Sequence, residues 1–326
     1  MKKIIAVILT LILVTGLFSA CSGNGESNAS NAQSGEKINI VTTIFPIYDW
    51  VKNIIGNDEN AQVEFLLDNG ADLHNYQPTA DDLIKVSNCD MFIYIGGESD
   101  KWVEDALKNA VNKNMVVINL LEVIGNNAKE EEIKEGMQSE EETEEGEETE
   151  YDEHIWLSLK NAILCVDEIS GKLASIGKEG NMYLTNADVY TKKLSGLESE
   201  YDSAINGAKI KTLVFGDRFP FRYLTEEYKL DYYAAFSGCS AESEASFETV
   251  SFLAKKVDEF NLKYVMTIES SDGKIAKTII ENTAKKNAEI LVLDSMQSIV
   301  DEDVKNGASY LTVMQNNLEV LKKALN

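Results

Sequence analysis

Histidine, cysteine and basic residues are all scarce in this chain. Its 326 residues include only two histidines and four cysteines, and 30 Lys and Arg face 55 Asp and Glu, for a net charge of −25. Nucleic acids are bound by Lys and Arg that replace counterions on phosphate, so this balance excludes nucleic acid as the expected partner. Cations are the partners that the charge favours.

Several catalytic and nucleotide-binding motifs are also missing. The sequence contains no Walker loop and no G-x-G-x-x-G turn to hold phosphate, and neither H-E-x-x-H nor G-x-S-x-G. The cysteines show no C-x-x-C spacing, and leave an odd number beyond Cys21. We therefore expect neither a disulfide framework nor an enzyme, and interpret Cys89 and Cys165, which lie among apolar residues, as small core side chains.

The N-terminus has the pattern of an export signal. A basic start precedes an apolar run, Ile4 to Phe18, that is short for a membrane span and is followed by small residues. "LFSAC" resembles the lipobox of bacterial lipoproteins, which predicts a signal peptide over 1–20, lipidation of Cys21 and a flexible Gly/Ser/Asn-rich tether over 21–36. The alternative is simple secretion with cleavage after Ala20.

Short apolar runs alternate with amphipathic stretches along the rest of the chain. Such alternation predicts βαβ units and parallel sheets, because parallel strands need a helical crossover. The pattern runs through the first half and returns after Lys209, so we expect two similar α/β lobes, over 37–180 and 209–326. Between them, aromatic and aliphatic residues recur at three- and four-residue spacing over 181–208. This periodicity predicts one long rigid connecting helix, with a surface helix of a single lobe as the alternative.

The segment 129–153 is far more acidic than its surroundings. Residues 130–153 hold fourteen Asp and Glu against one Lys, about half of the net charge of the chain. A block that repels itself and has little to bury stays solvated, so we predict an acidic disordered loop. Composition favours a solubilising role, and the functional alternative is a weak collector of cations.

Both histidines lie in loops that the predicted topology assigns to the first lobe. "NGADLHNYQPTADDL" places His74 after a strand, where open α/β sheets present ligands. "DEHIWLSLKNA" places His154 directly after the acidic segment. Neutral imidazole suits Zn²⁺ and its neighbours, so the two side chains are candidates for one shared metal site.

These two motifs are similar to G-x-x-x-H-x-Y-x-P and D-x-H-x-W-L in the metal-binding, zinc-type receptors of bacterial ABC importers. The resemblance extends from "VTTIFPIYDWVKNIIG" to the last strand, "AEILVLD". It implies two α/β lobes, one rigid helix and a metal in the cleft between the lobes. Zinc members carry a charged, usually His-rich loop before the second histidine. Here that loop has no His, which excludes metal capture by imidazoles in it.

The second lobe matches the family less closely. The resemblance implies a carboxylate ligand at Glu269 and a third ligand at a position where this chain has Arg218, which is always charged and cannot ligate. We take the neighbouring Asp217 as the substitute, with a helix N-cap as its alternative role. Cys239, Glu242 and Glu244, in "SGCSAESEASF", are further candidates.

The sequence thus predicts a monomeric, lipid-anchored receptor on the outer face of a bacterial membrane. It would bind zinc through His74, His154, Asp217 and Glu269 and pass the metal to an ABC permease. Manganese is the alternative metal, because two imidazoles with two carboxylates also suit it. A surface metallohydrolase and an adhesin are the alternative functions from other classes.

Overall fold

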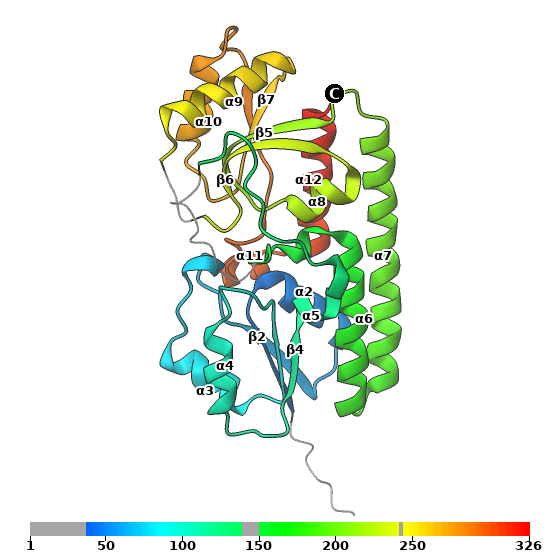
Figure 1. Ribbon diagram of the computed structural model, residues 1–326. Helices are drawn as coiled ribbons and strands as arrows, with labels where there is room; N and C mark the ends of the chain where they lie inside the picture. Colours follow the sequence, from blue (N-terminus) through cyan, green and yellow to red (C-terminus); the bar gives the residue numbers. More distant parts are fainter. Residues whose placement is uncertain (1–36, 139–149, 241–243) are drawn as a thin grey trace, which may run out of the picture. The chain divides into compact units, whose positions relative to one another are not determined.

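Two four-stranded parallel sheets form the centre of the fold in the computed structural model (Figure 1). The structure describes residues 37–138, 150–240 and 244–326. The predicted signal peptide, Cys21, the tether, the middle of the acidic segment and Glu242 lie outside these ranges.

The first sheet has the strand order β2-β1-β3-β4, with every pair parallel. Its strands are β1 (Ile38–Thr42), β2 (Ala61–Phe65), β3 (Met91–Tyr94) and β4 (Val116–Asn119). The helices that follow these strands are α2 (Phe45–Ile55), α3 (Ala80–Asn88), α4 (Trp102–Lys108) and α5 (Leu120–Ile124). Trp50, Val51, Ile54 and Ile55 of α2 are buried, as their helical spacing predicts.

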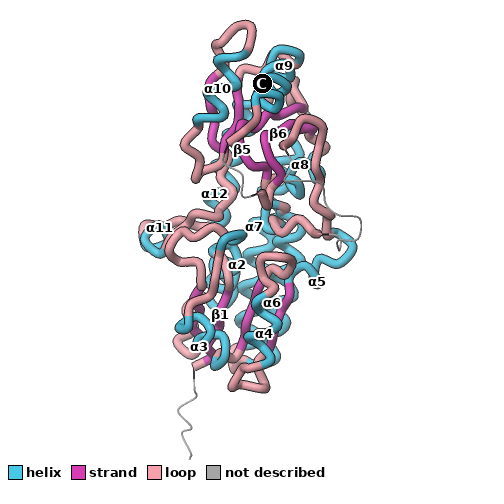
Figure 2. Tube along the Cα trace, turned by 60° about the vertical axis from the view of Figure 1, so that its left-hand side comes forward, coloured by secondary structure: helices cyan, strands magenta, loops and turns pink. Residues whose placement is uncertain are grey.

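The second sheet repeats this arrangement in the order β6-β5-β7-β8, again all parallel. Its strands are β5 (Thr212–Phe219), β6 (Asp231–Ser237), β7 (Tyr264–Thr267) and β8 (Glu289–Val292). The helices here are α8 (Arg222–Tyr228), α9 (Phe247–Glu259) and α10 (Lys274–Asn282). Figure 2 shows the strands of the two sheets as separate groups. The predicted fold class, two mostly parallel sheets flanked by helices, is confirmed.

A 27-residue helix, α7 (Gly180–Asn206), lies where the long connector is predicted. The aromatic and aliphatic residues that recur along one face of this helix are buried. Two of its tyrosine hydroxyls form hydrogen bonds, one to each half of the chain. Tyr190 donates to Asp49 of α2 at 3.2 Å, and Tyr201 donates to the carbonyl of Met314 at 2.6 Å. Met314 belongs to α12 (Tyr310–Ala324), which follows the second sheet. The helix therefore contacts α2 of the first lobe and α12 of the second, which a surface helix of a single lobe would not do.

The described residues also form the helices α6 (Leu159–Ile176), α11 (Asp301–Lys305) and α12, which we do not predict separately from the sequence. α6 packs along α7, while α11 and α12 close the chain. Tyr310 of α12 donates to the carbonyl of Trp156 at 2.6 Å, which ties the C-terminal helix to the loop that carries His154. No helix in the described part of the chain is long and apolar enough to cross a membrane.

The described parts of the acidic segment have defined contacts. Glu130 and Tyr151 form an isolated antiparallel bridge, so the two ends of the insertion meet each other. The prediction of a disordered loop over all of 129–153 is therefore wrong for these ends. Composition could not reveal this, because the contacts are made with distant parts of the chain. Cys89 and Cys165 are buried free thiols, as expected.

Candidate metal site

His74 lies in a single 3-10 turn, Leu73–Asn75, in the loop after β2. Asp72 caps this turn by accepting the backbone N–H of His74 at 3.0 Å. The ring Nδ1 lies 3.0 Å from the Ser99 hydroxyl and 3.4 Å from the Glu153 carboxylate. Burial, together with the neighbouring His154, lowers the pKa of His74 to about 3. Its imidazole is therefore neutral and able to ligate a cation.

His154 is fully buried directly before the 3-10 turn Ile155–Leu157. Its backbone N–H and its ring Nδ1 both lie within 3.0 Å of one Asp152 carboxylate oxygen. Burial alone would lower the pKa of His154, but the Asp152 charge and hydrogen bond outweigh it and raise that pKa. In the neutral ring, the carboxylate acceptor places the proton on Nδ1 and leaves the lone pair on Nε2, as in many metal-binding histidines.

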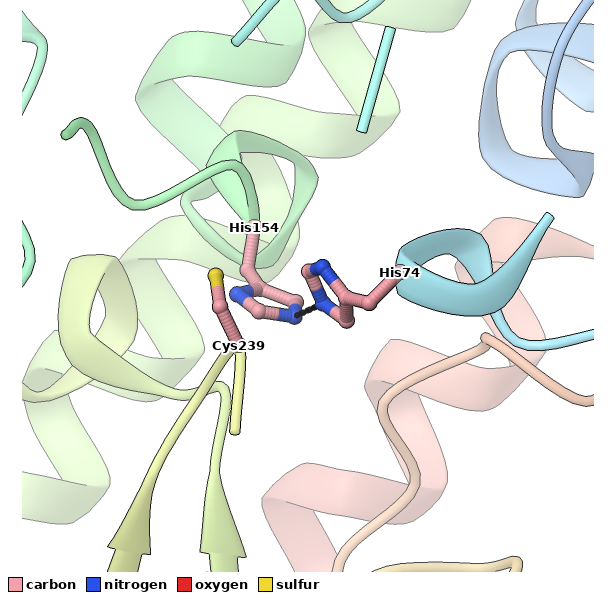
Figure 3. Close-up of side chains that lie close together, drawn as sticks. All are labelled: His74, His154 and Cys239. Carbon is pink, nitrogen blue, oxygen red and sulfur yellow. Dashed lines mark hydrogen bonds between the residues drawn. The ribbon is translucent and has the colours of Figure 1, made fainter. Parts of the chain in front are cut away.

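The two imidazoles point their Nε2 atoms at one another (Figure 3). These atoms are 3.1 Å apart. Two ligands at zinc distances in a tetrahedral site lie about 3.3 Å from each other. Both Nδ1 atoms are occupied by partners in the first lobe, so the facing Nε2 atoms are spaced as two ligands of a four-coordinate site would be.

Cys239 is the third member of the group. Among the described residues, the ligand atoms of His74, His154 and Cys239 form one set in which all lie within 4.8 Å of each other. Cys239 follows β6 of the second sheet. Burial and the nearby Glu131 carboxylate raise the pKa of its thiol well above the usual value, so a bound cation would have to displace the thiol proton.

Gly238 explains how the Cys239 loop approaches so closely. A Cβ atom at this position would lie 2.9 Å from the carbonyl of Phe219 and 3.0 Å from His154 Cε1. Only a glycine lets the backbone of the second lobe pass beside the imidazole without displacing it. The sequence signal that marks Cys239 as a candidate is the polarity of its loop together with the place of that loop on the second lobe.

Asp217 and Arg218 lie at the carboxyl end of β5 and do not join the three ligand atoms. Asp217 is a strand residue, and α8 begins at Arg222 after an uncapped Phe221, so the N-cap role considered for Asp217 is wrong. The strand extends further than its apolar run because a register shift between Phe215 and Arg218 keeps it paired with β6. Arg218 instead forms an ion pair with Asp72, two residues from His74.

Glu269 is also engaged outside the three-residue group. Its carboxylate accepts the backbone N–H of Ser295 at 2.8 Å and that of Gln297 at 3.0 Å, and the hydroxyls of Ser295 and Ser298 also donate to it. These donors all belong to one loop after β8. Glu244 is exposed and contributes no ligand to the group.

A cavity of about 270 Å³ is lined by two members of the group, His74 and Cys239, and by several carboxylates. These include Glu98, Glu131, Glu150 and Glu153. Burial, partly offset by hydrogen bonds from Ser99, raises the pKa of Glu153. A bound cation would offset this cost of burying carboxylates, so the four Glu side chains that line the cavity favour a cation beside the imidazoles.

The chain matches a known protein family over residues 40–324. That family is described as zinc-uptake complex component A, periplasmic. A zinc-binding protein of Streptococcus pyogenes, AdcA, is 29% identical over 329 residues, covering 99% of this chain and 61% of the relative. The chain therefore spans about three fifths of the length of the curated relatives that it first matches. The zinc uptake protein ZnuA of Bacillus subtilis is 27% identical, with 97% of both chains covered.

Solved structures show the same fold. The Zn(II)-bound ZnuA-like domain of Streptococcus pneumoniae AdcA has a TM-score of 0.68 at 28% identity, covering 89% of this chain and 99% of that domain. The zinc-binding protein TroA of Treponema pallidum has a TM-score of 0.71 at 21% identity, which indicates fold alone.

Proposed function

The chain belongs to the family of zinc-uptake complex component A, and on this premise we propose that it is an extracytoplasmic receptor for zinc. It would capture the ion between its lobes and deliver it to an ABC importer permease. Its chemistry is binding and release, so no catalytic residues are assigned. The receptor would act as a monomer that meets the permease at the outer face of the membrane.

One observation carries the proposal: two buried imidazoles face each other through Nε2 at 3.1 Å, each with its Nδ1 held by a partner. Two facing nitrogen lone pairs repel each other unless a proton or a cation lies between them. The low pKa of His74 keeps that ring unprotonated, whereas the raised pKa of His154 lets a proton on its Nε2 join the pair when no metal is bound. We propose that a divalent metal replaces this proton and binds both nitrogens.

The donor set favours zinc over manganese. Thiolate and imidazole are the ligands that zinc prefers, whereas manganese prefers oxygen donors. We propose His74, His154 and Cys239 as zinc ligands in the conformation described. Asp217 and Glu269 remain sequence-based predictions that require a different arrangement of the second lobe.

The membrane anchor is proposed from sequence and from relatives. The relative of Streptococcus pneumoniae, 30% identical over 99% of this chain, is named a zinc-binding lipoprotein. Lipidation of Cys21 would place the receptor beside its permease, because several acyl chains hold a protein stably at a membrane. Labelling with a palmitate analogue, absent in Cys21→Ala, would test this step.

Metal titration of the full chain tests the receptor function. Zinc at a hundredfold excess over its dissociation constant should stabilise the protein by about 2.7 kcal/mol. His74→Ala and His154→Ala should each weaken zinc binding more than about 100-fold. Each removes a proposed ligand, and loss of a residue that only hydrogen-bonds a ligand already costs about 10- to 100-fold. Glu281→Gln, an exposed change in α10, is the control and should bind as the wild type does.

Two results would contradict the proposal. Stoichiometric binding with unchanged affinity in both histidine variants would exclude the site. An equal affinity for manganese and zinc would contradict the role of the thiol. A metallohydrolase would in addition turn over a substrate, and an adhesin would show no stabilisation by metal.

A further inference from the structure

The first residues of the acidic insertion lie along the second lobe. We call residues 129–138 the strap. Its first backbone N–H, from Lys129, donates to the Tyr223 hydroxyl at 3.0 Å, and its last, from Gln138, donates to the carbonyl of Ala235 at 2.9 Å. The Gln138 side chain accepts the N–H of Ser246 at 2.7 Å. The strap therefore leaves the first lobe and follows β6 and the start of α9.

Side-chain contacts hold the middle of the strap. Lys134 bonds to Asp231 at 2.7 Å, and its ammonium lies 4.1 Å from the centre of the Tyr232 ring. Gly136 has a φ of +87°, and a Cβ there would lie 2.1 Å from the Phe252 ring. Any larger residue would clash with α9 and would also be strained, so this glycine is required for docking.

Glu131 is the strap residue that reaches the candidate metal site. One of its carboxylate oxygens accepts the backbone N–H of Cys239 at 3.3 Å, and the other lies 3.6 Å from the Cys239 sulfur. Glu131 also lines the cavity that contains His74 and Cys239. One carboxylate thus holds both the main chain and the side chain of the proposed second-lobe ligand.

We propose that Glu131 is a positioning residue for Cys239, and that the docked strap is an integral part of the zinc site. The inference rests on the proposed function. Glu131 orients Cys239 through its backbone N–H, and this bond persists when the thiol gives up its proton to the metal, as the Asp152 bond to Nδ1 of His154 does. For Cys239 this partner comes from the opposite lobe. The base of the acidic insertion therefore acts in metal binding, whatever its central residues do.

The arrangement has a reciprocal consequence. If strap docking strengthens zinc binding, zinc must strengthen strap docking by the same free energy. The backbone N–H groups of the strap should therefore exchange with solvent more slowly when zinc is bound. The amide of Gln138 is the best reporter, because it bonds to β6 and lies outside the site.

Glu131→Gln tests the inference in the full chain, with Glu135→Gln as the matched control. Both changes remove one charge from the strap, but Glu135 is exposed. Zinc affinity is measured by competition with a chelator, and Co²⁺ reports the sulfur through its thiolate charge-transfer absorption. Loss of the Glu131 charge by itself would lower the pKa of the Cys239 thiol and favour zinc, so weaker binding in Glu131→Gln would report lost positioning. We expect Glu131→Gln to bind zinc 10- to 100-fold more weakly with a reduced Co²⁺–thiolate band, and Glu135→Gln to match the wild type.

Gly136→Ala tests docking without touching the carboxylate. The added Cβ should displace the strap from Phe252. Zinc affinity should then fall, as in Glu131→Gln, and the Gln138 amide should no longer be protected from exchange when zinc is bound. Thermal unfolding of each variant without metal shows whether the fold is retained. Glu131→Asp, one methylene shorter, should recover part of the lost Co²⁺–thiolate band.

The outcomes separate the two proposals. If Glu131→Gln binds zinc like Glu135→Gln while His154→Ala does not bind, the strap inference is overturned and the receptor function stands. If His154→Ala also binds normally, the proposed function itself fails. Equal weakening by Glu131→Gln and Glu135→Gln would indicate a general charge effect and would also overturn the inference.

Discussion

The two lobes contribute to the candidate metal site in different ways. The first lobe presents two imidazoles whose Nδ1 atoms are already held, His154 by Asp152 and His74 by Ser99 and Glu153. The second lobe presents one thiol, and the carboxylate that holds this thiol belongs to the first lobe. One half of the site is complete by itself, and the other depends on contact between the lobes.

The same contrast appears in the residues around the site. Asp217 and Glu269 on the second lobe are engaged with neighbours in their own lobe. Arg218 reaches across to Asp72 instead of facing a metal. In the proposed receptor, the ion would therefore meet a first-lobe contact that is already formed and a second-lobe contact that depends on how the lobes meet.

The largest effect is expected when the proposed ligand of the second lobe is substituted. Cys239→Ser should lower zinc affinity about 100-fold and reduce the preference for zinc over manganese, because a hydroxyl is a much weaker zinc ligand than a thiolate. Glu269→Gln and Asp217→Asn should leave the affinity unchanged in the conformation described. A loss in Glu269→Gln as large as in Cys239→Ser would instead support the ligand set predicted from sequence.

The next test removes the first-lobe carboxylate that hydrogen-bonds a proposed ligand, Asp152 beside His154. Asp152→Asn should weaken zinc binding 10- to 100-fold, because the amide orients His154 less firmly than the carboxylate. The Asp152 charge raises the pKa of His154. Zinc binding needs neutral His154, so it is lost as pH falls through that raised pKa, and in Asp152→Asn the loss should move to lower pH. Affinity measured between pH 5 and 8 checks this, and an unmoved transition would contradict the assignment.

The smallest effect concerns the cross-lobe ion pair. Arg218→Met retains the length of the side chain and removes its bond to Asp72. Since partly exposed ion pairs contribute about 1 kcal/mol or less, zinc should dissociate only a few-fold faster. Stopped-flow release into a chelator measures this rate. A decrease in zinc affinity as large as that in Cys239→Ser would contradict this expectation and would mean that Arg218 is needed for the proposed ligands to meet.

Most of the fold follows from local patterns. Strand and helix periods alternate clearly in both halves, so the described residues form two parallel sheets flanked by helices, as the pattern predicts. The strand β5 is an exception, since Asp217 and Arg218 extend it beyond its apolar run. Pairing with β6 supplies the hydrogen bonds there, and no local signal shows such pairing. The helices α6 and α12 pack on α7. Neither of them is predicted separately from the sequence, because this packing is not visible in local patterns.

The two histidines could be found because their residue type is rare and their motifs are distinctive. Cys239 could be identified only as one candidate among several in a polar loop. Its place beside the imidazoles depends on Gly238, which allows the loop to pass His154. Glu131 carried no signal at all among fourteen acidic residues, because its role comes from a contact with a residue more than 100 positions away.

The sequence by itself determined the two parallel α/β sheets, the long helix between them and the pair of imidazoles, since these depend on periodicity and on rare residues in local motifs. The tertiary structure decided which side chain of the second lobe meets those imidazoles and that the base of the acidic insertion is folded. Both depend on the approach of two lobes, which local patterns do not encode. Non-local contacts become visible only when the chain is folded.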